Sequence, residues 1–433
     1  MPQASASGPR TSRPKRRWRI PPPIVQDAEG PGPEGLSILR EIDGEVGLVV
    51  WKSLRSVLLW AEASHQDRWN LFDDDAARRR ESEILEYLPG APPGLADAVR
   101  DLLPVLAHTD QVDAEFVGGA CQRIANWAEG KNAPRTRLEF LQAAALACPS
   151  DPSYALAVGR AARDLTHYSR AEAWYQRALG LSRQVGKWEV YVRAYLSHGN
   201  MMLRRGAVPA ARRSFLKGLR RSRRQGIRGV EGEALHDLCV LEWRAANRGL
   251  ALDYGEQAVR VQGHQHPGLP RLAHDIAYLW LEEGHYAHAL PVFMATLGKV
   301  NEVERPVVLG SIGRAAAGAG DVSGYEWARR RLLDAPPGPG VAESWVDLAL
   351  AAARLKRTEE VEEAARLAES IARARKEGQM RLMAESILAD VSRQAGSQPE
   401  AVVVEDERSN RLARDLLRTL QLVPASSQSP ASV

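Results

Sequence analysis

The feature that most constrains this 433-residue chain is a small residue that returns at nearly even intervals between residues 159 and 349. Successive copies are 40, 40, 38, 36 and 36 residues apart, and each is followed seven residues later by a turn. Self-similarity at this period predicts stacked helical hairpins, each of which buries its apolar face against its neighbours. The small positions are Gly159, Gly199, Cys239, Ala277, Gly313 and Ala349, and the turns lie near Thr166, Gly206, Ala246, Gly284, Gly320 and Lys356.

The composition agrees with an all-α fold and with a soluble protein of the cytoplasm. Hydrophobic residues make up 44% of the chain and charged residues 26%, and alternating Val/Ile runs are scarce. The three cysteines, Cys121, Cys148 and Cys239, are isolated and odd in number, which favours a reducing compartment over a disulfide framework. The longest apolar stretch, residues 46–61, is too short to span a bilayer, and no secretory signal is evident.

Four segments are expected. Residues 1–35 are rich in Pro, Gly, Ser and Arg and predict a disordered basic arm, with six Lys/Arg and no acid in the first twenty residues. Residues 36–110 predict a helical N-terminal region with Trp51, Trp60 and Trp69 in its core, and 111–396 predict the repeat array. Residues 397–433 should hold a linker, a helix near 409–421 that folds back on the array or docks a partner, and a disordered tail.

The repeats resemble the tetratricopeptide repeat family, whose units alternate small and aromatic residues across the two helices of a hairpin. The resemblance covers about two-thirds of the chain and implies a right-handed superhelical solenoid of about six or seven hairpins. It is best in three units, although the period of up to 40 residues exceeds the family's usual length. The matching sets are Gly159, Tyr168, Ala171, Tyr175 and Ala178; Tyr195, Gly199, Gly206, Ala211 and Phe215; and Trp280, Gly284, Tyr286, Ala289 and Phe293.

In the resembled family the first helix of each unit lines a concave groove that binds peptides. The corresponding offsets in this sequence combine guanidinium groups with flat aromatic rings, which suits a carboxylate-bearing peptide. We therefore expect a non-catalytic, regulatory interaction scaffold that binds a protein or peptide partner, for which an acidic segment is a candidate. The candidate partner-binding residues are Arg160, Arg163, Asn200, Arg204, His236, Trp243, Arg244, His274 and Tyr278.

No enzyme, cofactor or metal is expected. His236 and His274 each precede an Asp, but adjacent residues of a helix do not face each other, and no nucleophile accompanies them. The other histidines of this region lack the Cys or acid spacing of a zinc site.

The alternative is a signalling or transcription-associated regulator that contacts nucleic acid through the basic arm and an Arg-rich strip. Residues 190–230 hold eleven Lys/Arg and no acid. Residues 114–134 also resemble a helix-turn-helix unit with its turn at Gly118, although Asp113 and Gly119 depart from that pattern. Nucleic-acid binding is the less favoured interpretation.

Overall fold

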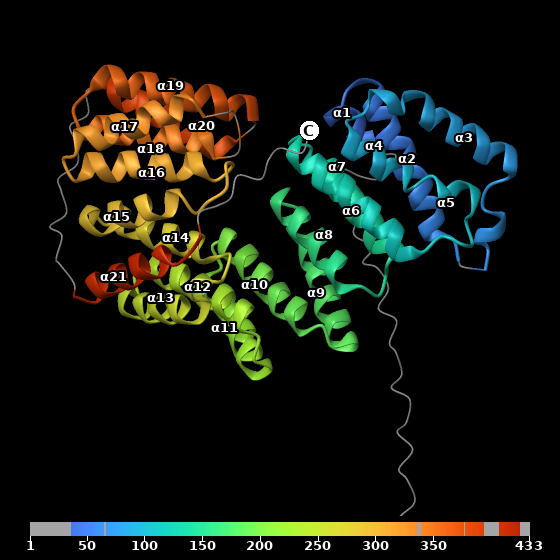
Figure 1. Cartoon of the computed structure of the whole chain (residues 1–433), viewed down its shortest axis with the longest axis horizontal. Coiled ribbons are helices and arrows are strands. Elements are labelled where there is room, and N and C mark those ends of the chain that lie inside the picture. Colours follow the sequence, from blue (N-terminus) through green and yellow to red (C-terminus); the bar gives the residue numbers. More distant parts are fainter. Residues whose placement is uncertain are drawn as a thin grey trace, which may run out of the picture. The chain divides into compact units, whose positions relative to one another are not determined.

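The computed structural model describes residues 36–64, 66–335, 338, 340–375, 377–393 and 407–424. Within these residues every regular element is a helix, which confirms the all-α prediction (Figure 1). The chain divides into two compact units, residues 1–197 and 198–433. The predicted basic arm, the linker up to residue 406 and the tail after residue 424 lie outside the described residues. The predicted segment boundaries stay predictions.

The first unit holds the N-terminal helices, two complete hairpins and most of a further helix. Its α-helices are α1 (Leu36–Glu41), α2 (Gly44–Glu62), α3 (Asp74–Tyr87), α4 (Pro93–Arg100), α5 (Pro104–Ala107), α6 (Ala114–Gly130), α7 (Pro134–Ala147), α8 (Pro152–Asp164), α9 (Tyr168–Val185) and α10 (Trp188–Arg204). The unit boundary falls inside α10, between Ser197 and His198.

The second unit continues the hairpins and ends in two further helices. Its α-helices are α11 (Val208–Gln225), α12 (Arg228–Arg244), α13 (Arg248–Gln262), α14 (Leu269–Glu282), α15 (Tyr286–Leu297), α16 (Arg305–Gly318), α17 (Val322–Leu333), α18 (Val341–Arg354), α19 (Thr358–Arg375), α20 (Gly378–Ser392) and α21 (Glu407–Gln421). We call the first helix of each hairpin an A helix (α8, α10, α12, α14, α16, α18) and the second a B helix (α9, α11, α13, α15, α17, α19).

All six predicted turn positions adopt the left-handed backbone conformation. Their φ angles are 63° at Thr166, 74° at Gly206, 59° at Ala246, 82° at Gly284, 77° at Gly320 and 59° at Lys356. After each of them an amide bonds back to the A helix, for example His167 N to Ala162 O at 2.9 Å. This 6→1 bond is the standard way to end a helix sharply. Asn132, at 54°, makes the same turn between α6 and α7, so the described residues hold seven such hairpins.

The small positions bring the two helices of a hairpin into contact. A Cβ added at Gly159 would lie 2.6 Å from the Tyr175 ring, and one at Gly199 would lie 2.4 Å from the Phe215 ring. Both rings are fully buried. At Gly313 the space is taken instead by Leu348 of α18, which draws α16 and α18 together. The predicted small–aromatic packing is therefore confirmed in the units of Gly159 and Gly199, two of the three best-matched units.

The N-terminal region packs against the first hairpin. The Glu41 carboxylate accepts hydrogen bonds from Arg135 N (3.0 Å), Thr136 N (2.8 Å) and the Thr136 hydroxyl (2.9 Å), so it caps the start of α7. Trp60 is buried and donates to Thr109 O at 2.7 Å. The expectation that Trp69 joins this core is wrong. Trp69 is 72% exposed because it sits in a single 3₁₀ turn, Arg68–Asn70, beyond the apolar face of α2.

The helix-turn-helix resemblance is also wrong. Gly118 lies inside α6, which runs unbroken from Ala114 to Gly130. A Cβ at Gly118 would meet Cys148 Sγ at 2.8 Å and the Tyr154 hydroxyl at 3.0 Å. The glycine is thus needed for close packing and makes no turn.

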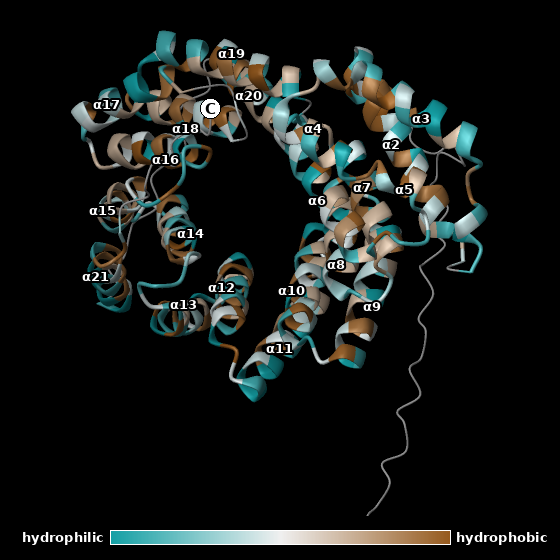
Figure 2. Cartoon of the chain, turned by 45° about the vertical axis from the view of Figure 1, so that its right-hand side comes forward, coloured by the Kyte–Doolittle hydropathy of each residue, from teal (hydrophilic) through white to brown (hydrophobic). Residues whose placement is uncertain are grey.

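The C-terminal helix α21 folds back on its own unit. It lies between α13 and α15, with Leu412, Leu416 and Leu420 buried against them (Figure 2). Among the described helices, none combines the length and apolar character required to cross a membrane.

The turns that lack glycine provide a stability test. A β-branched residue at positive φ is strained, and glycine is not, so Thr166→Gly should stabilise the fold by about 1 kcal/mol. Gly206→Ala should destabilise it by about the same amount, because an added Cβ there meets open space and the loss comes from backbone strain alone. Urea unfolding followed by circular dichroism would measure both changes. If both substitutions change the free energy of unfolding in the same direction, backbone strain at these turns is not the cause.

Candidate functional site

One position of the repeat carries a hydrogen-bonding side chain in five successive A helices. It lies two residues before the small position, and we call its occupants the junction residues. They are Ser197, Asp237, Asp275, Ser311 and Asp347. Each accepts or shares a hydrogen bond with a side chain of the preceding A helix, so it ties one repeat to the next.

The partners of the junction residues come from two further offsets, one residue after and three residues before the small position. Because these offsets lie on the same face of the helix, their side chains point toward the following A helix. The pairs are Arg160 Nε to Ser197 Oγ (3.0 Å), Asn200 Nδ2 to Asp237 (3.4 and 3.5 Å), His236 Nε2 to Asp275 Oδ2 (2.9 Å), His274 Nε2 to Ser311 Oγ (3.3 Å) and Arg314 Nη1 to Asp347 Oδ1 (3.0 Å).

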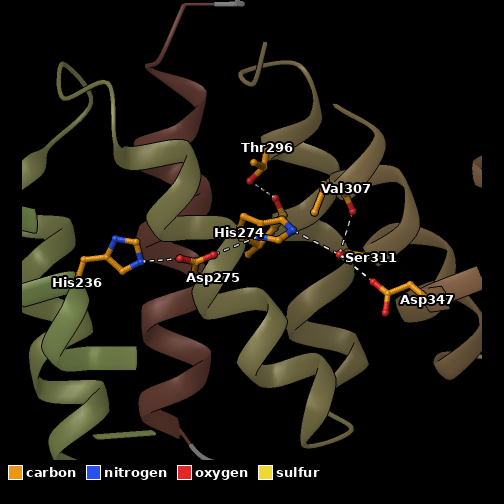
Figure 3. A network of polar contacts seen from close by, with 8 residues as sticks. His236, His274, Asp275, Thr296, Val307, Ser311 and Asp347 are labelled. Carbon is orange, nitrogen blue, oxygen red and sulfur yellow. Dashed lines mark hydrogen bonds and ion pairs between the residues drawn. The ribbon is translucent and has the colours of Figure 1, made fainter. Parts of the chain in front are cut away.

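In the second unit these pairs join into a chain of contacts across α12, α14, α16 and α18 (Figure 3). Asp275 accepts from His236 and also lies 3.4 Å from His274 Nδ1. Ser311 donates to Val307 O at 3.1 Å and lies 3.5 Å from Asp347 Oδ2. The chain therefore runs without a break from His236 to Asp347.

The far end of the chain is closed by Arg314. It reaches both the Asp347 carboxylate and the Tyr278 hydroxyl, the latter at 3.3 Å, and His274 stacks on the Tyr278 ring at 6.1 Å and 25°. Burial, with the nearby Asp347 carboxylate, raises the pKa of Tyr278, so this hydroxyl stays neutral. We call the second-unit members of this set, together with Glu343 of α18 beside Asp347, the polar row: Asn200, His236, Asp237, His274, Asp275, Tyr278, Ser311, Arg314, Glu343 and Asp347.

The carboxylates of the polar row differ in how well their charge is compensated. Burial alone would raise the pKa of Asp275, but its bonds to His236 and His274 outweigh that effect and hold it well below the usual range. Asp237 has only the long bonds from Asn200. Burial raises the pKa of Asp237 to about 6, even though His236 and Asn200 favour the charged form.

Glu343 resembles Asp237 in this respect. Burial and the neighbouring Asp347 raise its pKa. Within the described residues neither Asp237 nor Glu343 forms an ion pair with a Lys or Arg. Both side chains remain partly accessible to solvent, and a cation placed beside either carboxyl group would favour its ionised form.

The remaining predicted residues lie in different surroundings. In the first unit, Arg163 pairs with Asp164 at 2.9 Å. In the second, Arg204 and Arg244 are exposed near the ends of their helices, and Trp243 is only 8% exposed with Arg248 over its ring. A role in partner binding for these residues, and for Arg160, stays a prediction.

The sequence prediction placed His236, His274, Asn200 and Tyr278 on this surface but missed its acids. The signal was present, since the position two before each small residue reads Ser, Asp, Asp, Ser, Asp in five units. Arg314 was also missed, although it occupies the same offset as Arg160, Asn200 and Tyr278. Within the described residues no group of three or more His, Cys, Asp or Glu is arranged to hold a metal ion.

The helical hairpins and their turns together define a tetratricopeptide-like helical-repeat fold. No protein-family model and no curated protein match the sequence. Three of the solved structures that resemble this chain show how weak the similarity is. The crystal structure of a Rap protein complexed with competence and sporulation factor has 13% identity and a TM-score of 0.46, covering 77% of this chain and 99% of that one.

The second is a signal-transduction ATPase with numerous domains and a tetratricopeptide repeat sensor, from Pyrococcus horikoshii. It has 12% identity and a TM-score of 0.45, covering 90% of this chain and 61% of that one. The third is a circular tandem repeat protein with 14% identity, a TM-score of 0.16, and coverage of 89% and 88%. Similarities this low assign no function, and the fold assignment rests on the helices and turns of this chain.

The raised pKa of Asp237 predicts that this residue lowers the stability of the fold at neutral pH. Because its folded-state pKa, about 6, lies above that of an unfolded aspartate, about 3.9, the folded protein loses stability as the pH rises through this window. The Asp237→Asn variant should therefore have the same free energy of unfolding as the wild type near pH 4. Above pH 7 its free energy of unfolding should be larger than that of the wild type by roughly 1 kcal/mol, after allowance for solvent screening. Urea unfolding at pH 4 and at pH 8 measures this difference.

The exposed Asp334 serves as the matched control for this measurement. Asp334→Asn should change the free energy of unfolding little at either pH, because that side chain lies in water. If the difference in free energy of unfolding between Asp237→Asn and the wild type is the same at pH 4 and pH 8, the raised pKa of Asp237 is contradicted.

Proposed function

We propose that the protein is a non-catalytic interaction module whose polar row binds an extended peptide segment of a partner protein. The observation that carries the proposal is Asp237, a half-buried carboxylate that forms no ion pair with a Lys or Arg within the described residues and has a raised pKa, although His236 and Arg271 favour its charged form. A Lys or Arg side chain of a ligand would supply the missing charge. The proposal therefore favours a basic peptide over the acidic one that the arginine pattern suggested.

The arrangement of the row supports a peptide as the ligand. Its members come from successive A helices, so a bound chain that crosses these helices would meet a hydrogen-bonding side chain at each step. His274 and Tyr278 add flat contact area at low entropic cost. The side chains are already held by one another, so little order is lost on binding.

The cellular setting that fits this proposal is the cytoplasm. Cys121, Cys148 and Cys239 are free thiols, and all three are buried. Burial raises the pKa of Cys148 to about 11 and raises that of Cys239 to about 12, so these thiols are poor nucleophiles. They suit a structural role in a reducing compartment.

Binding of fluorescein-labelled peptides to the full chain tests the proposal. Ala/Ser-based twelve-residue peptides that carry two Lys, two Glu or no charge would be compared by fluorescence anisotropy at pH 8. We expect the Lys peptide to bind. The double variant Asp237→Asn and Glu343→Gln should lower the affinity for this peptide about tenfold, the equivalent of ~1.4 kcal/mol. Affinity should rise with pH through about 6, as Asp237 ionises.

The arginine prediction provides the opposing arm of the same experiment. Replacing Arg160, Arg204 and Arg244 together by Ala should leave binding of the Lys peptide unchanged. Preferential binding of the Glu peptide, lost in this triple variant, would reject the basic-peptide proposal in favour of the acidic partner.

A further inference from the structure

The helix α21 is an amphipathic helix that packs between two B helices of the second unit. Its apolar residues Leu412, Leu416 and Leu420 are buried between α13 and α15. At its start Arg408 pairs with Asp253 and Glu256 of α13, the latter at 3.4 Å. The chain thus contains its own example of an amphipathic helix seated in the array by apolar burial and matched charge (Figures 1 and 2).

The neighbouring space, between α11 and α13, is an open groove of about 740 Å³. Its apolar lining is Leu216 from α11 with Leu250 and Tyr254 from α13, and Leu250 is 42% exposed. Much of its polar lining is internally bonded, since Arg212 donates to Glu242 at 2.5 and 2.7 Å and Asn247 donates to Glu242 at 2.8 Å. Above these groups the groove presents Leu250, which is exposed, and Leu216 and Tyr254, which are partly exposed.

The charge on the two walls of the groove is unequal. Helix α11 contains no Asp or Glu. Arg212 forms an ion pair with Glu242, and Arg223 forms an ion pair with Glu231. The outward stripe at i, i+4, i+7 and i+11 consists of Arg213, Lys217, Arg220 and Arg224, all exposed.

At 100° per residue, this stripe lies immediately beside Leu216 on the helix surface. On α13, by contrast, Asp253 and Glu256 face α21 and are engaged by Arg408. The α11 wall is thus the cationic one, and it adjoins the apolar lining.

We propose that the groove between α11 and α13 docks an amphipathic helix of a partner protein. Its apolar stripe contacts Leu216, Leu250 and Tyr254, and its flank toward α11 is acidic. This is the helix-in-groove mode of recognition, with the charge pattern of α21 and α13 reversed. A phosphate backbone would match the cationic stripe but would leave the apolar lining uncovered. This surface is separate from the polar row, so the two proposals fail independently.

The test uses a probe derived from the chain itself. A labelled synthetic copy of residues 407–421, with its four arginines at 408, 411, 414 and 418 replaced by Glu, keeps the leucine stripe and carries an acidic face. Fluorescence anisotropy with the full chain should show saturable binding. Leu216→Asp and Leu250→Asp should each weaken it at least tenfold, as should the triple variant Arg213→Glu, Lys217→Glu and Arg220→Glu.

Leu382→Asp is the matched control, because Leu382 is an exposed leucine on α20, away from the groove. It should leave the affinity unchanged, and circular dichroism should show that every variant stays folded. The unmodified basic copy of residues 407–421 should bind at least tenfold more weakly than the acidic one.

Three results would overturn the proposal. The first is that the acidic helix does not bind. The second is binding that survives both Leu216→Asp and Leu250→Asp, which would place the helix elsewhere, such as the site of α21. The third is that a DNA duplex binds through the arginine stripe, unaffected by Leu216→Asp, while the acidic helix does not compete with it.

Discussion

The close contact that a small residue of an A helix allows with the side chain packed over it is the interaction on which the repeat depends. Gly159 beneath Tyr175 and Gly199 beneath Phe215 leave no room for a Cβ, which sets the separation of the two helices in these two hairpins, and Gly313 does the same for α16 and α18. The left-handed turn seven residues later holds the helices in one register. With separation and register set, every A helix presents the same offsets to the next, and the junction hydrogen bonds follow from that geometry.

Those hydrogen bonds give the polar residues of the A helices a different role from the one that the sequence suggests. His236 and His274 look like ligand-binding or catalytic groups in the sequence, but in the structure they bond to Asp275 and Ser311 of the next helix. They hold repeats together and, at the same time, position acids at the surface. Asp237 differs from Asp275, because Asn200 compensates its charge only weakly. Asp237 and Glu343, which form no ion pair with a Lys or Arg in the described part of the chain, are the carboxylates at which we propose that a ligand cation binds.

The second unit carries two surfaces of opposite charge, one on its A helices and one on the B helix α11. Acids accumulate in the polar row on the A helices, whereas the α11 stripe on the B side is purely cationic. The α13 acids would weaken that stripe, but Arg408 of α21 neutralises them. Surfaces of opposite sign suit partners of opposite sign, since charge complementarity governs selectivity more than raw affinity. The nearly balanced net charge of +4 conceals this division.

The sequence alone was enough to predict the hairpins and their turns, because these depend on local periodicity and on which residues tolerate positive φ. Thr166, Ala246 and Lys356 were placed at turns by spacing although none is glycine. Only the tertiary structure decided which polar residues meet, where α21 docks, and that Trp243 is buried while Trp69 is not. These outcomes depend on contacts between side chains that in most cases lie thirty or more residues apart, and no local pattern encodes such a neighbour.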